Sequence, residues 1–188
     1  MALILASGSP RRKELLGLIT PDFEICVSGA EETVDPNLSP ADTVLALSRV
    51  KGEAVAREHP EDTVIAADTV VALDGKILGK PASAAEAEHM LRFLSGRTHA
   101  VYTGVYIASG GREVRFYEKT DVSFYPLTNE EIGEYVATGE PFDKAGAYGI
   151  QGKGALLVKG IHGDYFNVVG FPVAAVRRAL KKLENAKQ

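Results

Sequence analysis

Residues 3–16 constrain the fold more than any other stretch, because a strand pattern changes to a helix pattern there within a few positions. Residues 3–6 are apolar and indicate a buried strand, and residues 7–8 indicate a tight turn. The pair Ser9-Pro10 is typical of the cap and first position of a helix. The chain therefore begins with a strand, a turn and a helix.

Three cations, Arg11, Arg12 and Lys13, follow in the first turn of this helix. The partial positive charge at the N-terminus of a helix makes each of these cations locally unfavourable by roughly a few tenths of a kcal/mol. Free N–H groups, guanidinium groups and the hydroxyls of Ser7 and Ser9 together favour a phosphate site. The alternative is a plain serine cap beside surface arginines. The motifs GxxxxGK[ST] and GxGxxG are absent here, so neither of these nucleotide fingerprints applies.

The composition sets limits on the class of protein. With 188 residues, 45% of them hydrophobic, the chain can bury a sizeable core, and we expect one domain over residues 1–188. A net charge of −4 argues against a nucleic-acid partner. We expect no membrane partner and a cytoplasmic location, because no apolar run is long enough for a span and no signal peptide is apparent. The lone Cys26 is expected to be a buried structural thiol.

Strand and helix signals alternate along the chain, and the long hairpin strands indicate an α/β fold with a mixed sheet rather than a doubly wound parallel one. We expect helices flanking the sheet and two lobes around a cleft. The predicted strands cover residues 23–28, 63–73, 99–109, 112–125 and 155–158. The predicted helices cover residues 39–59, 83–95 and 128–139, with a C-terminal helix that ends in a frayed basic tail at 181–188.

Two charged residues interrupt apolar patterns. Lys51 falls in the apolar row of the helix at 39–59, so its head either reaches water along a buried stem or enters a polar cleft. Asp68 interrupts the apolar strand at 63–73 and must meet a cation, a metal or several donors. A catalytic or metal-binding role for Asp68 competes with a structural salt bridge or a turn cap.

Residues 142–154 contain four glycines, so the backbone there can turn tightly or lie against a flat ligand. Gln151 offers an acceptor and two donors that match the O4 and N3–H edge of uracil or thymine, although a solvated glutamine would suit a loop equally well. The four histidines have no metal-ligand spacing in the sequence.

The chain resembles the Maf family of nucleoside triphosphate pyrophosphatases over roughly residues 3–175. The resemblance implies the fold of inosine triphosphate pyrophosphatases, with an elongated mixed sheet. It also implies a cytoplasmic, dimeric enzyme that cleaves a nucleoside triphosphate between its α and β phosphates. The matching segments are residues 7–12, 31–32, 67–69, 79–81, 94–97 and 143–152.

The resemblance also implies roles for single residues. Asp68 matches the proton acceptor, and Glu32, with Asp68, matches the carboxylates that hold Mg²⁺ or Mn²⁺. The residues around the triphosphate are Arg12, Lys51 and Lys80. The residues that separate subfamilies are Arg11, Thr69 and Gln151, and this set resembles the branch that cleaves dTTP and UTP, with modified pyrimidine nucleotides as further candidates.

Two other functions compete with this expectation. Family members are associated with inhibition of septum formation, so the chain could regulate cell division through a protein partner without catalysis. A nucleotidyltransferase would also bind triphosphates through a basic N-terminal loop, but would transfer the nucleotide to an acceptor.

Overall fold

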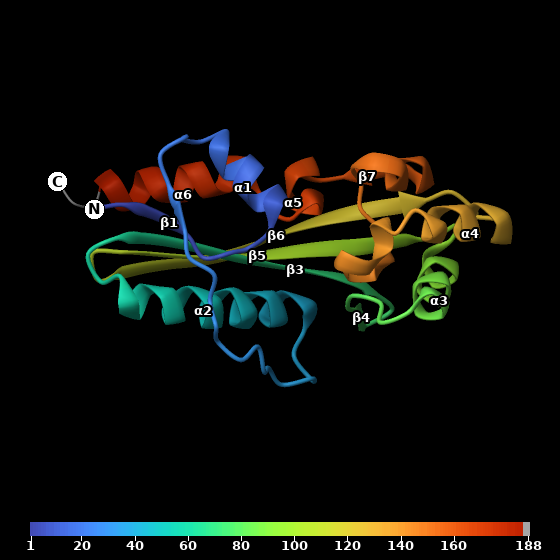
Figure 1. The fold of residues 1–188 in the computed structure, drawn as a ribbon, viewed down its shortest axis with the longest axis horizontal. Coiled ribbons are helices and arrows are strands. Elements are labelled where there is room, and N and C mark those ends of the chain that lie inside the picture. Colours follow the sequence, from blue (N-terminus) through green and yellow to red (C-terminus); the bar gives the residue numbers. More distant parts are fainter. Residues whose placement is uncertain (186–188) are drawn as a thin grey trace. The chain divides into compact units, whose positions relative to one another are not determined.

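A mixed β-sheet of seven strands runs through the part of the chain that the structure, a computed structural model, describes, residues 1–185 (Figure 1). Its order is β2-β1-β3-β5-β6-β7, and β4 pairs with β3. Strand β1 runs parallel to β2 and β3, whereas the β3–β4 and β6–β7 pairs are antiparallel. The strands are β1 Leu3–Leu5, β2 Glu24–Ile25, β3 Thr63–Leu73, β4 Lys76–Leu78, β5 Thr98–Ser109, β6 Arg112–Phe124 and β7 Val158–His162.

The predicted helices begin at their predicted caps. Each cap hydroxyl accepts a hydrogen bond from the backbone N–H three residues later, which satisfies one otherwise unpaired donor. The α-helices are α1 Pro10–Gly17, α2 Pro40–Glu58, α3 Ala84–Leu94, α4 Asn129–Ala137, α5 Tyr165–Val169 and α6 Val173–Asn185. Three 3₁₀ helices, η1 Glu140–Asp143, η2 Ala145–Ala147 and η3 Gly152–Leu157, follow α4. The expected mixed sheet with flanking helices is confirmed.

Three details differ from the predictions. Strand β2 covers only two residues of the predicted 23–28. The predicted strand at 155–158 is wrong, because residues 155–157 belong to η3 and expose Leu156, and β7 begins at Val158. A short apolar run does not distinguish a strand from a helical turn. Residues 181–185 continue α6 rather than fraying, and residues 186–188 of the predicted tail lie outside the described residues.

The described residues divide into two compact units. The first comprises Met1–Asp68, Thr103–Glu118 and the chain from Gly170 on, and the second comprises Thr69–Tyr102 and Lys119–Val169. The single domain and the cleft remain predictions. Among residues 1–185, none of the helices combines the length and the apolar character that a membrane span needs.

In the first unit, α2 lies on one face of the sheet, and α1 and α6 lie on the other (Figure 1). Helix α2 packs very closely against the sheet. A Cβ atom added to Gly104 of β5 would lie 2.3 Å from the Val44 carbonyl oxygen, and one added to Gly52 of α2 would lie 2.1 Å from the Tyr106 ring. Glycine at both positions is therefore a packing requirement.

The core of the second unit is built from α3, α4 and the adjoining strands, and a buried polar contact lies within it. His99 Nε2 lies 2.7 Å from the Tyr148 hydroxyl, and both rings pack edge-on against Phe124. This contact ties the glycine-rich segment after α4 to the sheet.

Candidate functional site

The turn between β1 and α1 holds the Arg12 side chain in place. Arg12 Nε donates to the Gly170 carbonyl oxygen at 3.0 Å, and its Nη1 donates to Ser7 Oγ at 3.3 Å. The buried Ser7 hydroxyl also accepts the Ser9 backbone N–H at 3.2 Å, and Ser9 Oγ caps α1 through the Arg12 N–H at 3.4 Å. Of the two serines predicted to bind phosphate, Ser7 thus orients the guanidinium group and Ser9 caps the helix that carries it.

Burial lowers the pKa of Arg12 from its ordinary value, and three charges adjust it. Asp68 raises the Arg12 pKa, the like charge of Arg11 lowers it further, and Glu32 raises it. Arginine nevertheless stays protonated in proteins. Asp68 and Glu32 are therefore close enough to Arg12 to influence its charge electrostatically.

The Lys51 ammonium group, at the middle of α2, lies between two carboxylates. Its Nζ atom is 2.5 Å from Asp68 Oδ1 on β3 and 3.0 Å from Glu32 Oε2 in the loop before α2. The Lys51 and Asp68 side chains are only 15% and 13% exposed, whereas Glu32 is 53% exposed. Lys51 therefore does not extend into open solvent, and Asp68 has the cationic partner that its burial requires.

This arrangement also tests whether a divalent cation fits the chain. Because Glu32 and Asp68 oxygens both lie within 3.0 Å of one nitrogen, they can share a single cation. Magnesium and manganese favour oxygen ligands of this kind. The predicted metal-binding pair thus has the right chemistry and placement.

The other predicted site residues belong to the second unit, apart from Arg11, which is half-buried in the first turn of α1. Thr69 follows Asp68 on β3, so its side chain points to the opposite face of the sheet. Lys80 is exposed in the loop after β4, whose Gly79 carbonyl oxygen accepts the Gly146 N–H at 3.0 Å. Gln151 is exposed immediately before η3. That these three residues form one site with Asp68 remains a prediction.

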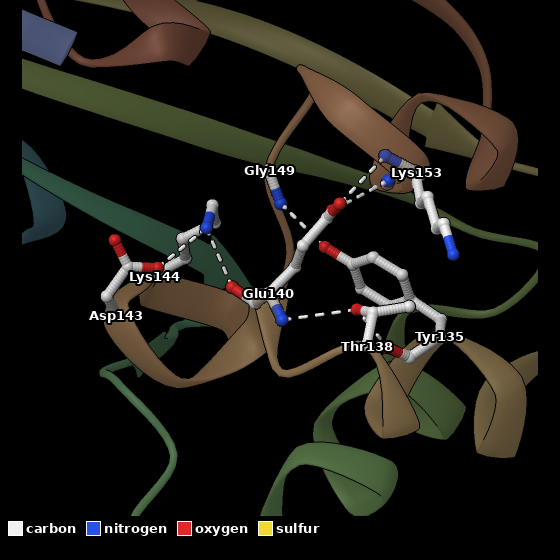
Figure 2. A network of polar contacts seen from close by, with 8 residues as sticks. Tyr135, Thr138, Glu140, Asp143, Lys144, Gly149 and Lys153 are labelled. Atoms are coloured by element: carbon white, nitrogen blue, oxygen red, sulfur yellow. Dashed lines mark hydrogen bonds and ion pairs between the residues drawn. The ribbon is translucent and has the colours of Figure 1, made fainter.

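Sequence analysis missed the contacts that hold the segment around Gln151 (Figure 2). The Glu140 carboxylate accepts the backbone N–H groups of Lys153 and Gly154, and the Tyr135 hydroxyl accepts that of Gly149. Glycines bring no side-chain acceptors, so the N–H groups of an irregular glycine-rich segment need acceptors from elsewhere in the fold. That need is the signal that could have pointed to an acidic residue nearby.

One histidine does join a group of potential metal ligands. Cys26, Glu58 and His59 place their ligand atoms within 4.8 Å of one another, because pairing of β2 with β1 brings Cys26 beside the end of α2. Sequence spacing alone did not indicate that His59 lies in this group. Cys26 is half-buried against the core of the first unit, and the group includes neither Glu32 nor Asp68.

Comparisons with known proteins bear on the family and on the fold. The profile of the family described as Maf-like protein matches residues 2–183. A dTTP/UTP pyrophosphatase of Bacillus cytotoxicus is 57% identical over 97% of this chain and 95% of its own length, and one of Bacillus mycoides is 56% identical over 97% and 96%. The solved structure of a HAM1 protein from Coxiella burnetii has a TM-score of 0.52 at 14% identity, covering 97% of this chain and all of that one, which supports the fold alone.

The family profile spans nearly the whole chain, and the relatives share more than half of its residues over nearly their full length. The segments that carry the sequence resemblance include Arg12, Glu32 and Asp68, and the structure places Lys51 against the last two. This chain therefore belongs to the Maf-like protein family.

Proposed function

We propose that this protein hydrolyses dTTP and UTP to the nucleoside monophosphate and pyrophosphate. The observation that carries the proposal is the Lys51 ammonium group held between Asp68 and Glu32, with the Arg12 guanidinium group close enough for both carboxylates to raise its pKa. Cations and carboxylates in one cluster suit a polyphosphate that arrives with a divalent cation. Relatives at 57% and 56% identity carry the name dTTP/UTP pyrophosphatase.

Arg12 and Lys51 bind the phosphate groups in this proposal. Arg12 is held by Ser7 and Gly170, so little side-chain freedom is lost when it meets a phosphate oxygen. Lysine has three N–H donors, and the two carboxylates engage two of them, which leaves one for the substrate. Lys80 supplies a further positive charge from its exposed loop.

Asp68 accepts the proton of the attacking water. The water oxygen forms a bond to the α phosphorus, the bond from that phosphorus to the bridging oxygen breaks, and pyrophosphate leaves with the bonding electrons. Glu32 and Asp68 would hold Mg²⁺ or Mn²⁺, and the bound ion would neutralise part of the phosphate charge. Arg12 and Lys51 stabilise the charge that develops on the departing oxygens.

Gln151, Thr69 and Arg11 select the base. The Gln151 amide donates to O4 and accepts from N3–H of uracil or thymine, whereas adenine and cytosine present an amino donor in place of O4. The net charge of −4 suits free nucleotides better than nucleic acid. We further propose a homodimer in the cytoplasm.

Product analysis tests the reaction. Purified protein with UTP or dTTP and Mg²⁺ is expected to release pyrophosphate and the monophosphate, whereas orthophosphate and the diphosphate would refute the assigned bond. Asp68→Asn keeps the shape of the side chain but removes the base, so kcat should fall by about 10²- to 10⁴-fold. The control is Asp121→Asn, which changes another strand aspartate paired with a lysine and should leave kcat unchanged. Equal kcat for both variants would remove Asp68 from the reaction.

A further inference from the structure

The segment that carries Gln151 is held by two side chains that precede it in the chain, Tyr135 of α4 and Glu140 of η1 (Figure 2). Glu140 Oε1 accepts the Lys153 backbone N–H at 3.1 Å, and Oε2 accepts the Gly154 N–H at 3.3 Å. One carboxylate thus satisfies two consecutive amides just after Gln151. Neither amide lies in a regular strand or α-helix that would otherwise bind it.

Tyr135 holds the other side of Gln151. Its hydroxyl oxygen accepts the Gly149 N–H at 3.2 Å. Burial raises the pKa of Tyr135 to about 12, the Gly149 amide opposes this, and Glu140 raises it further, so the phenol stays protonated at neutral pH. Gln151 therefore lies between two anchored points, Gly149 and Lys153.

Glu140 is itself fixed at both ends of its backbone (Figure 2). Its N–H donates to Thr138 Oγ1 at 3.1 Å, and its carbonyl oxygen accepts from Lys144 Nζ at 2.7 Å. Lys144 Nζ also pairs with Asp143 at 2.6 Å. The carboxylate consequently projects from a rigid turn, which makes it a firm anchor for the segment.

The glycines of the segment permit this closure. A Cβ atom on Gly154 would lie 2.0 Å from the Gly149 carbonyl oxygen, so the two ends of the segment touch. Gly152 has a φ of +66°, and its Cβ would lie 2.8 Å from Glu140 Oε1. The backbone on both sides of Gln151 is therefore compact, although the Gln151 side chain is exposed.

We infer that Glu140 is a positioning residue for base selection. It fixes the backbone that carries Gln151, the residue that hydrogen-bonds to the pyrimidine. This inference rests on the proposed function. A carboxylate is required because both of its oxygens accept an N–H, whereas an amide would turn its own N–H₂ group toward one of the two amides. Glu140 does not act on the phosphates, so its effect falls on base recognition rather than on bond cleavage.

The test compares Glu140→Gln with Glu134→Gln, the same change at an exposed acid of α4. Kinetics with UTP, dTTP and GTP should show KM for UTP raised about tenfold, kcat within about twofold, and preference for UTP over GTP reduced by about tenfold. Hydrogen exchange without nucleotide should be at least about tenfold faster at the Lys153 and Gly154 amides. Glu134→Gln should match the wild type in both assays.

The outcomes separate this inference from the proposed function. If the wild type releases no pyrophosphate from UTP or dTTP, the proposed function fails, whatever the exchange rates are. If the wild type is active and Glu140→Gln exchanges faster but keeps its preference for UTP, the inference fails. Should Glu140→Gln not fold, Tyr135→Phe removes the hydroxyl acceptor of the Gly149 N–H and should raise KM for UTP without lowering kcat. An unchanged KM in that variant would also overturn the inference.

Discussion

The close packing of α2 on the sheet predicts that Gly104→Ala damages both stability and catalysis. The added methyl group would lie 2.3 Å from the Val44 carbonyl oxygen, and ordinary contact begins at 3.4 Å. The helix must therefore move by about 1 Å. Gly52 on the same helix lies against the Tyr106 ring, so tilting α2 toward that ring offers no relief. Overpacking of this kind lowers the free energy of unfolding by about 1–3 kcal/mol.

The same movement carries Lys51 away from Asp68, because both the 2.5 Å contact and the clash depend on the distance between α2 and the sheet. A displacement of about 1 Å can lower kcat/KM by about 10²-fold. Urea unfolding measures the first effect, and pyrophosphate release from UTP measures the second.

Gly133→Ala is the matched control, since this glycine is in α4 and a Cβ atom there meets nothing within 4 Å. It should raise the free energy of unfolding by about 0.5–1 kcal/mol and leave kcat/KM unchanged. If Gly104→Ala unfolds at the same urea concentration as the wild type, the argument from close packing is wrong.

Three further predictions concern other positions. Lys51→Met should abolish turnover. It should also raise the affinity for Mn²⁺ in the absence of nucleotide by about tenfold, because the Lys51 ammonium group competes with the metal for the two carboxylates. A Mn²⁺ titration followed by electron paramagnetic resonance measures this affinity, and an unchanged value would contradict the prediction. Burial lowers the pKa of His99 to about 4, with Asp121 opposing. Below about pH 6.5 the unfolded chain therefore binds one more proton at His99 than the folded chain does. The free energy of unfolding should fall by about 3 kcal/mol between pH 6.5 and pH 4, and urea unfolding measures this. His99→Gln should remove this component. Gln151→Glu should lower the preference for UTP over GTP, because a carboxylate cannot donate to O4; an unchanged ratio of kcat/KM values would exclude Gln151 from base recognition.

The elements that the sequence predicted well depend on neighbouring residues. Strand β3 covers the predicted residues 63–73, because an apolar run bounded by turn residues needs no distant partner to be identified. The caps Ser9 and Ser39 bind amides three residues away. The β3–β4 turn follows from Asp74-Gly75, both with positive φ.

The sequence by itself thus determined the fold class, the helix starts and the presence of a carboxylate and a lysine in apolar surroundings. Only the tertiary structure decided that Lys51 pairs with both Asp68 and Glu32, that Ser7 orients Arg12, and that Glu140 binds the amides after Gln151. Local patterns report burial and backbone preference, which act within one element. The partner of a buried charge or an unpaired amide depends on which elements pack together, and for Lys51 that is the approach of α2 to β3 and β5.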